Sequence, residues 1–225
     1  MNKKFALGLI LSFFLFSLSS FADDQKPGSG WAVDVRAGTL GIGGDLNRSI
    51  VPSVLNVRVG ASFFKYSADF DSSDVTYNGK LKLGAVPIAI DVFPFKNKLR
   101  LGGGIIINLN EVTGSAKATG GTIELGGTTY NLTDLGQVDG KVKFNRAAPY
   151  FGLGFDNPIK KTGHFGFFVD LGLMYHGDPT ATLTATKPLT TRMQQDLDKQ
   201  ILKTNNDIKD YHIFPIIQLG LSYKF

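Results

Sequence analysis

The sequence predicts an all-β fold, an antiparallel transmembrane β-barrel of about eight strands with a short loop helix. Three observations support this class. The chain begins with a segment typical of a secretory signal peptide, its later segments alternate apolar and polar residues, and its last strand ends on an aromatic residue, Phe225. After residue 22, no apolar run approaches the roughly 20 residues that a membrane-spanning helix needs, so a helical membrane protein is excluded.

The N-terminus has the three parts of a signal peptide. Two lysines stand near the start, residues 5–18 are nearly all apolar, and small residues lead up to Ala22. We expect residues 1–22 to be removed as a signal peptide and residues 23–225 to form the outer-membrane β-barrel domain. An uncleaved anchor is the alternative, but the apolar run is short for a membrane helix.

The composition excludes several other classes of protein. The chain has 225 residues, a formal charge of +5 and no cysteine, which excludes a disulfide framework and a thiolate metal site. No basic cluster is interleaved with aromatic residues, so we expect no nucleic-acid partner. The glycine-rich runs at 41–44 and 102–104 precede no helix, unlike phosphate-binding loops, and we expect no cofactor.

Alternation with a period of two residues predicts the strands. In the segment 165–176, one face is apolar from Phe165 to Tyr175, and the other face carries Asp170 and two glycines. The same pattern predicts seven strands, at about 31–46, 53–69, 79–94, 98–113, 140–156, 164–177 and 210–225.

Barrels of this kind have an even number of strands, so an eighth is needed. We assign it to Thr180–Thr186, whose threonine content favours a strand. This assignment conflicts with the usual orientation, because a first strand that starts at residue 31 in the periplasm would put segment 114–139 on the periplasmic side, where turns are short. Either an N-terminal strand has been missed or 114–139 is a strand extension, and residues 122–130 within it look like a hairpin.

The polar face of the predicted strands carries charges in mid-strand positions, together with many glycines. A membrane barrel turns its apolar face to lipid and its polar or small residues to the lumen, whereas a soluble barrel does the reverse. Alternation alone leaves both alternatives open. The charges are Asp34, Arg36, Arg58, Asp91, Arg100 and Asp170.

These six charges have two interpretations. They could line a path for ions or solutes, or they could pair across an eight-strand interior, which is just wide enough for side chains to fill. Acids and bases are equal in number, and an unpaired buried charge is costly. We therefore expect a paired network that fills the lumen.

The C-terminal strand favours the membrane barrel. Apolar or aromatic residues recur at every second position up to the chain end, at Ile217, Leu219, Leu221, Tyr223 and Phe225. This register resembles that of small bacterial outer-membrane barrels, the class of the membrane domain of outer membrane protein A and of OmpW. The resemblance implies a location in the cell outer membrane, contact with its lipid, and an assembly signal read by the barrel-assembly machinery, formed by Leu219, Leu221, Tyr223 and Phe225.

One segment has helical spacing. Thr190 or Thr191 is placed to cap a helix whose apolar residues recur every four positions, at Leu189, Met193, Leu197 and Ile201. We expect a loop helix that packs over the barrel mouth, since a narrow stripe needs only one apolar surface. A helix that recruits a partner or lies on the membrane surface is the alternative.

Histidines and aromatic residues are the remaining candidates. His176 and His212 with Asp178 could bind a metal, but without a spacing motif a pair of rim histidines is the simpler interpretation. His164, His176 and His212 lie in no recognisable catalytic motif, so we expect the protein to have no enzymatic activity. Aromatic residues near strand ends are expected to form girdles at the membrane interfaces: Trp31, Tyr66, Phe93, Phe95, Tyr150, Phe165, Tyr175, Tyr211, Tyr223 and Phe225.

The function predicted on these grounds is that of an integral outer-membrane barrel with a structural or surface-interaction role, which contacts a partner through its loops. The alternative is a narrow channel or carrier for small solutes across the outer membrane. A lipid-active outer-membrane enzyme is less favoured, for want of a catalytic constellation.

Overall fold

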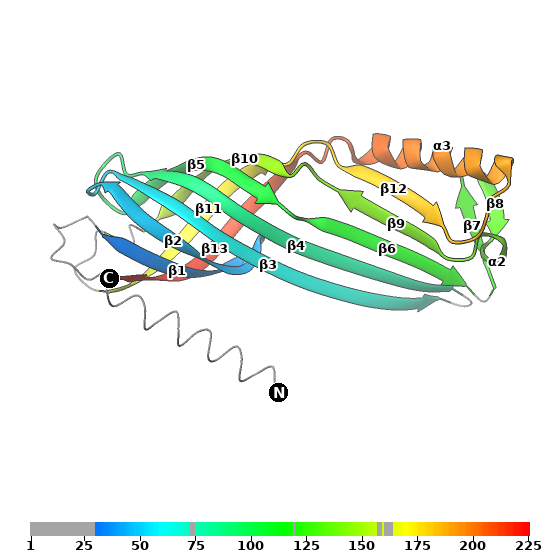
Figure 1. Cartoon of the computed structure of the whole chain (residues 1–225), viewed down its shortest axis with the longest axis horizontal. Helices are drawn as coiled ribbons and strands as arrows, with labels where there is room; N and C mark the ends of the chain where they lie inside the picture. Colours follow the sequence, from blue (N-terminus) through cyan, green and yellow to red (C-terminus); the bar gives the residue numbers. More distant parts are fainter. Residues whose placement is uncertain (1–29, 73–74, 119, 157–158, 160–163) are drawn as a thin grey trace, which may run out of the picture.

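The computed structural model describes residues 30–72, 75–118, 120–156, 159 and 164–225 (Figure 1). The predicted signal peptide lies outside the described residues. The elements in chain order are β1 (Trp31–Gly38), β2 (Gly41–Val51), β3 (Leu55–Ser72), β4 (Val75–Val92), β5 (Leu99–Asn108), β6 (Glu111–Ala118), β7 (Thr122–Leu125), β8 (Thr128–Asn131), α2 (Leu132–Leu135), β9 (Val138–Lys143), β10 (Ala147–Phe155), β11 (Phe165–Tyr175), β12 (Thr180–Ala185), α3 (Thr191–Ile208) and β13 (Ile213–Lys224).

Eight of the described strands close into an antiparallel barrel. Neighbours in the wall follow the order β1, β2, β3, β4, β5, β10, β11 and β13, and β13 pairs with β1 to complete the circle. The predicted fold class is therefore confirmed. None of the described helices is both long enough and apolar enough to span a membrane.

The segment predicted as one strand at 31–46 is two strands joined by a tight turn, so that prediction was wrong. β1 and β2 pair with each other up to Gly38 and Gly41, with Thr39 and Leu40 at the tip. Gly41 takes a φ of +97°, a conformation that glycine adopts without strain. Because glycines are frequent throughout the barrel strands, Gly38 and Gly41 gave no distinct turn signal in the sequence.

Counting β1 and β2 separately removes the conflict over orientation. The short β2–β3 and β4–β5 turns lie at the same end of the barrel as Trp31 and Phe225, whose backbones are joined by a hydrogen bond of 3.1 Å (Figure 1). The long connections lie at the other end. The prediction that Thr180–Thr186 supplies the eighth barrel strand is wrong, because the missed strand lies near the N-terminus.

One side of the barrel wall, at β3 and β4, continues past the rim, which is the level of the β1–β2 turn (Figure 1). Below the rim β4 pairs with β5, and above it β4 pairs with β6, β6 with β9, and β9 with β12. The result is an open five-stranded sheet of β3, β4, β6, β9 and β12. β3 and β4 have 18 residues each, which spans about 60 Å at about 3.4 Å per residue, against an apolar band of about 25 Å.

We call the part above the rim the outer domain; it comprises the described residues within 65–82, 111–143 and 180–208. Segment 114–139 thus contains a strand extension, and the predicted hairpin at 122–130 is formed by β7 and β8. One face of the sheet has its own core, to which the hairpin, α2 and α3 contribute. Its buried members are Ala116, Leu125, Leu132, Leu135, Val138 and Leu197.

Helix α3 packs on this sheet (Figure 1). The prediction that it packs over the barrel mouth is therefore wrong. Thr190, one of the two caps that the sequence allowed, caps the helix and accepts a hydrogen bond from the Met193 amide at 3.3 Å. Asn205 pairs with the backbone of Ala181 on β12, donating to its carbonyl at 3.1 Å and accepting from its amide at 2.7 Å. The helix thereby covers an edge strand that would otherwise offer unpaired backbone groups.

Asp196 of α3 ties the helix to the hairpin and should make this contact sensitive to acid. Its carboxylate accepts hydrogen bonds from Lys199 at 2.9 Å and from the Tyr130 hydroxyl at 2.7 Å, which lower its pKa from 3.8 to about 2. Because the folded pKa lies below the unfolded one, the stabilisation is present above about pH 4 and is lost as the pH falls through 2.

We therefore expect the protection of α3 amides against hydrogen exchange to fall between pH 4 and pH 2, while barrel amides stay protected. Asp196→Asn should remove this pH dependence. Constant protection of α3 in the unsubstituted protein over the same range would contradict the assignment.

Candidate functional site

The barrel wall is apolar outside and charged inside. Along β11, Phe167 and Leu171 are more than half exposed, whereas Asp170 between them is buried. Arg58 and Arg100, which face it across the lumen, are also buried. A soluble barrel fills its interior with apolar side chains and turns charges outward. The soluble alternative is therefore excluded, and the outer face of this wall suits lipid.

Arg58 occupies the centre of the buried charges. Its guanidinium binds Asp91 through two nitrogen–oxygen contacts of 3.0 and 3.2 Å, the forked geometry that makes arginine–carboxylate pairs strong. The same group lies 3.3 Å from Asp170 and 3.8 Å from Asp45. One cation thus joins carboxylates from three different strands of the wall.

Two further arginines complete the network. Arg100 forms ion pairs with Asp170 and, at 3.5 Å, with Asp91, and its guanidinium stands 5.8 Å from the ring centre of Phe168. Arg36 binds Asp45 at 2.8 Å. Each of the three arginines is thus held by at least one buried carboxylate, as buried charges require.

The structure brings five of the six predicted lumen residues into the network: Arg36, Arg58, Asp91, Arg100 and Asp170. Asp34 lies beside it, has no ion-pair partner among the described residues, and accepts a hydrogen bond from Asn47 at 2.8 Å. Sequence reasoning missed Asp45, because the false strand 31–46 obscured which of its residues face inward. With Asp45 and Asp34 included, these charges are four aspartates and three arginines instead of three of each.

Glycines in mid-strand make room for the large side chains. A Cβ on Gly154 would overlap both the Asp170 carboxylate and the Arg100 guanidinium. A Cβ on Gly172 would overlap the ring of Tyr150. Glycine at these inward positions therefore lets long charged and aromatic side chains fill the interior.

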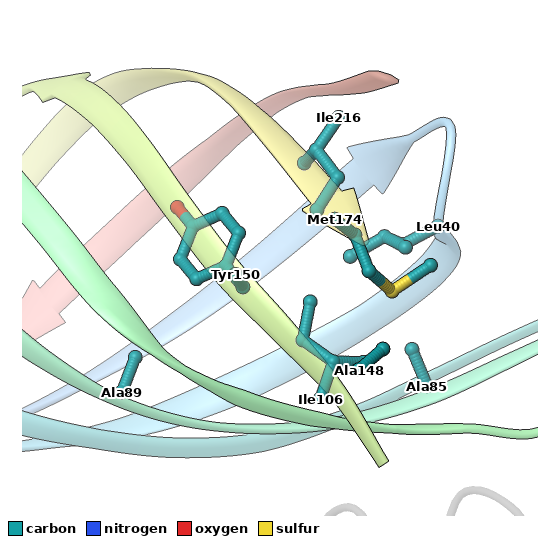
Figure 2. Packing of buried hydrophobic residues seen from close by; sticks show 8 residues of the cluster. All are labelled: Leu40, Ala85, Ala89, Ile106, Ala148, Tyr150, Met174 and Ile216. Carbon is teal, nitrogen blue, oxygen red and sulfur yellow. The ribbon is translucent and has the colours of Figure 1, made fainter. Parts of the chain in front are cut away.

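An apolar cap lies in the lumen above the charges (Figure 2). Its side chains come from the β1–β2 turn and from strands around the wall: Leu40, Ala85, Ala89, Ile106, Ala148, Tyr150, Met174 and Ile216. A cavity of about 10 Å³ lies between cap and network, bordered by Arg58, Tyr150 and Gln218 among others. This cavity has room for about one water molecule.

Some predicted girdle residues lie elsewhere. Tyr150 points from β10 into the lumen (Figure 2), and Phe93 is buried just after the end of β4. Tyr66 lies above the rim in the outer domain. At the ends of β11, Phe165 and Tyr175 are exposed on the outer wall as an interfacial ring requires.

The histidines do not gather into one site. His176 follows β11 and His212 precedes β13, the neighbouring strand, and the backbones of the two histidines are joined by a hydrogen bond of 3.0 Å. The His176 ring stacks on Phe144, with ring centres 4.4 Å apart. His164 lies at the opposite end of β11, and no group of three or more potential metal ligands occurs in the described part of the chain.

The C-terminal strand closes the barrel. β13 pairs with β1 on one side and β11 on the other, and Leu219 and Leu221 project outward. The rings of Tyr223 and Phe225 lie edge to face, 5.3 Å apart. The role of these residues as an assembly signal stays a prediction.

Comparison with solved structures gives the same architecture. CarO2 from Acinetobacter baumannii aligns at 22% identity with a TM-score of 0.57, over 87% of this chain and 98% of CarO2. CarO from the same organism aligns at 19% identity with a TM-score of 0.57, over 89% and 100% of the two chains. The chain has the fold of CarO.

A more distant structure is a major outer membrane protein from Thermus thermophilus, with 14% identity and a TM-score of 0.45, over 87% of this chain and 100% of that one. No protein-family model and no curated protein matches the chain. At these identities the likeness to CarO shows the fold alone.

Removal of Arg58 tests the network. Arg58→Met removes the cation that three buried carboxylates share. We expect the free energy of unfolding to fall by about 3–5 kcal/mol. Arg146→Met, an exposed control beyond the rim, should change stability by less than about 0.5 kcal/mol. Urea unfolding of both variants in lipid vesicles measures the difference, and equal stability of the two would contradict a network that depends on Arg58.

Proposed function

We propose that the protein is an integral outer-membrane barrel with a sealed lumen, which holds its outer domain at the cell surface for contact with external partners. The observation that carries the proposal is the filled interior, where ion pairs and an apolar cap leave a cavity of about 10 Å³. An eight-strand barrel whose lumen is filled in this way can anchor the protein in the membrane but leaves little room for ions or solutes to pass.

The orientation follows from the lengths of the connections. Barrels of this class have short turns in the periplasm and long connections outside. The β2–β3 and β4–β5 turns and the described chain ends would then face the periplasm, and the outer domain would stand above the outer leaflet. Outer-membrane lipid would surround the apolar wall, and the barrel-assembly machinery would insert the protein.

The outer domain carries an exposed apolar surface that suits a partner. Phe64, Tyr66, Phe70 and Tyr77 lie on the face of the sheet that continues the lumen side of the wall, and we call them the aromatic strip. All four are exposed, and Phe70 is 65% exposed. Contiguous exposed aromatics on a soluble surface are typical of interaction sites.

A carrier for small apolar solutes is the second candidate, and the position of the strip favours it. The strip descends to Phe64, two residues from Ser62, whose hydroxyl donates to the carbonyl of Leu40 in the cap at 3.0 Å. An apolar solute could therefore pass from the strip to the cap. Passage through the barrel would then require the cap and the Arg58 network to separate, which the closed lumen opposes.

The display role is tested with single cysteines, since the chain has none of its own. We expect Lys203→Cys on α3 to react with a membrane-impermeant maleimide on intact cells, and Lys98→Cys at the β4–β5 turn to react only after the outer membrane is permeabilised. Both lysines are exposed, so accessibility to the reagent decides the result. Labelling of Lys98→Cys but not Lys203→Cys on intact cells would refute the orientation and the proposal.

A further inference from the structure

The outer face of the five-stranded sheet carries lysines arranged in rows. Backbone pairing places the members of the first row side by side across the strands, at Lys65, Lys82, Glu111, Lys143 and Thr180. The second row, two residues further from the membrane, is Ser67, Lys80, Thr113, Lys141 and Thr182. The two rows together contain five lysines and only one carboxylate, that of Glu111.

These rows begin where the lipid-facing surface ends. On β3, Phe63 is 74% exposed on the outer wall, and Lys65 is the next residue on the same face. Leu109, after β5, is likewise followed on that face by Glu111. Because side chains two apart in a strand share a face, the lysines form the first polar layer above the apolar belt.

The positive charge of these two rows is only partly neutralised. The next row on the same face carries Asp69 and Asp139, and neither carboxylate forms an ion pair with these lysines in the described residues. Lys141 binds Glu111 at 2.6 Å, and this contact, with Lys82 and Lys143 nearby, lowers the pKa of Glu111. Lys65, Lys80, Lys82 and Lys143 are exposed and form no ion pair with the described residues. Lys65 and Lys82 stand directly opposite each other, and like charges in that position are destabilising. A bound anion between them would remove the repulsion.

The same face is hollowed. A recess of about 390 Å³ lies over the second row and the row beyond it, and is lined by Lys80, Lys141, Thr113, Ser115 and Thr182, with Asp139 at one side. Ammonium groups and hydroxyls are hydrogen-bond donors that suit phosphate oxygens. The recess therefore offers room for a phosphorylated headgroup just beyond the first lysine row.

We propose that this face binds the phosphorylated sugar headgroup of the glycolipid in the outer leaflet, the lipid A part of lipopolysaccharide. The proposal rests on the orientation given under the proposed function, which puts the lysine rows at the level of that leaflet's phosphates. The acyl chains of the glycolipid would lie along the apolar wall below Phe63.

The test is binding of diphosphoryl lipid A to the whole protein folded in detergent micelles. We expect a variant with Lys65, Lys80, Lys82 and Lys143 all changed to Gln to bind at least about tenfold more weakly than the unsubstituted protein. The matched control changes four lysines on or beside α3 to Gln, and should bind as the unsubstituted protein does: Lys187, Lys199, Lys203 and Lys209. Equal affinity of the two variants would overturn the proposal.

Two further measurements use the unsubstituted protein, so they do not depend on the folding of a variant. Its affinity for diphosphoryl lipid A should exceed its affinity for the dephosphorylated lipid, and should weaken as salt is raised from about 50 to about 500 mM. Equal binding of the dephosphorylated lipid, no salt dependence, or equally tight binding of phosphatidylglycerol would each overturn a headgroup site for this glycolipid. Because binding in micelles is independent of orientation in the cell, these results are separate from the cysteine labelling.

Discussion

The ion pairs of Arg58 in the middle of the barrel are the interaction on which the rest of the architecture depends. An eight-strand wall in lipid encloses only enough space for side chains, so charges inside it must be balanced by each other. Arg58 reaches carboxylates on β2, β4 and β11 at once, and inward glycines leave room for these carboxylates. The apolar cap lies above this arrangement, and the sealed lumen and the surface display of the outer domain that we propose both rest on these two features.

The outer domain follows from how the wall is built. Strands on one side of the barrel continue past the rim, and their alternation continues with them. The face that pointed to the lumen becomes an apolar face, covered by α3, α2 and the β7–β8 hairpin and open at the aromatic strip. The face that pointed to lipid becomes polar and rich in lysine above Phe63. One sheet thus presents two chemically different surfaces at the membrane boundary.

The sequence predicted the barrel because alternation is a property of neighbouring residues. It also predicted α3, its Thr190 cap and five of the six residues of the charge network. It missed the turn at Thr39 and Leu40, since Gly38 and Gly41 are no different from the other glycines in this chain. Because the turn was missed, the eighth strand was assigned to Thr180–Thr186 and Asp45 was not recognised as facing the lumen. The same error placed the long connections on the periplasmic side. Which strands leave the barrel above the rim depends on long-range pairing, and local patterns carry no information about it.

The central claim, that the lumen is sealed, is tested most directly by single-channel conductance of the refolded protein in planar bilayers. The account predicts no discrete conductance from protein shown to be folded, because the cap and the Arg58 network leave room for about one water molecule. Discrete conductance that changes with Arg58→Ala or Asp170→Ala would show that ions pass through the network, and would contradict the sealed barrel.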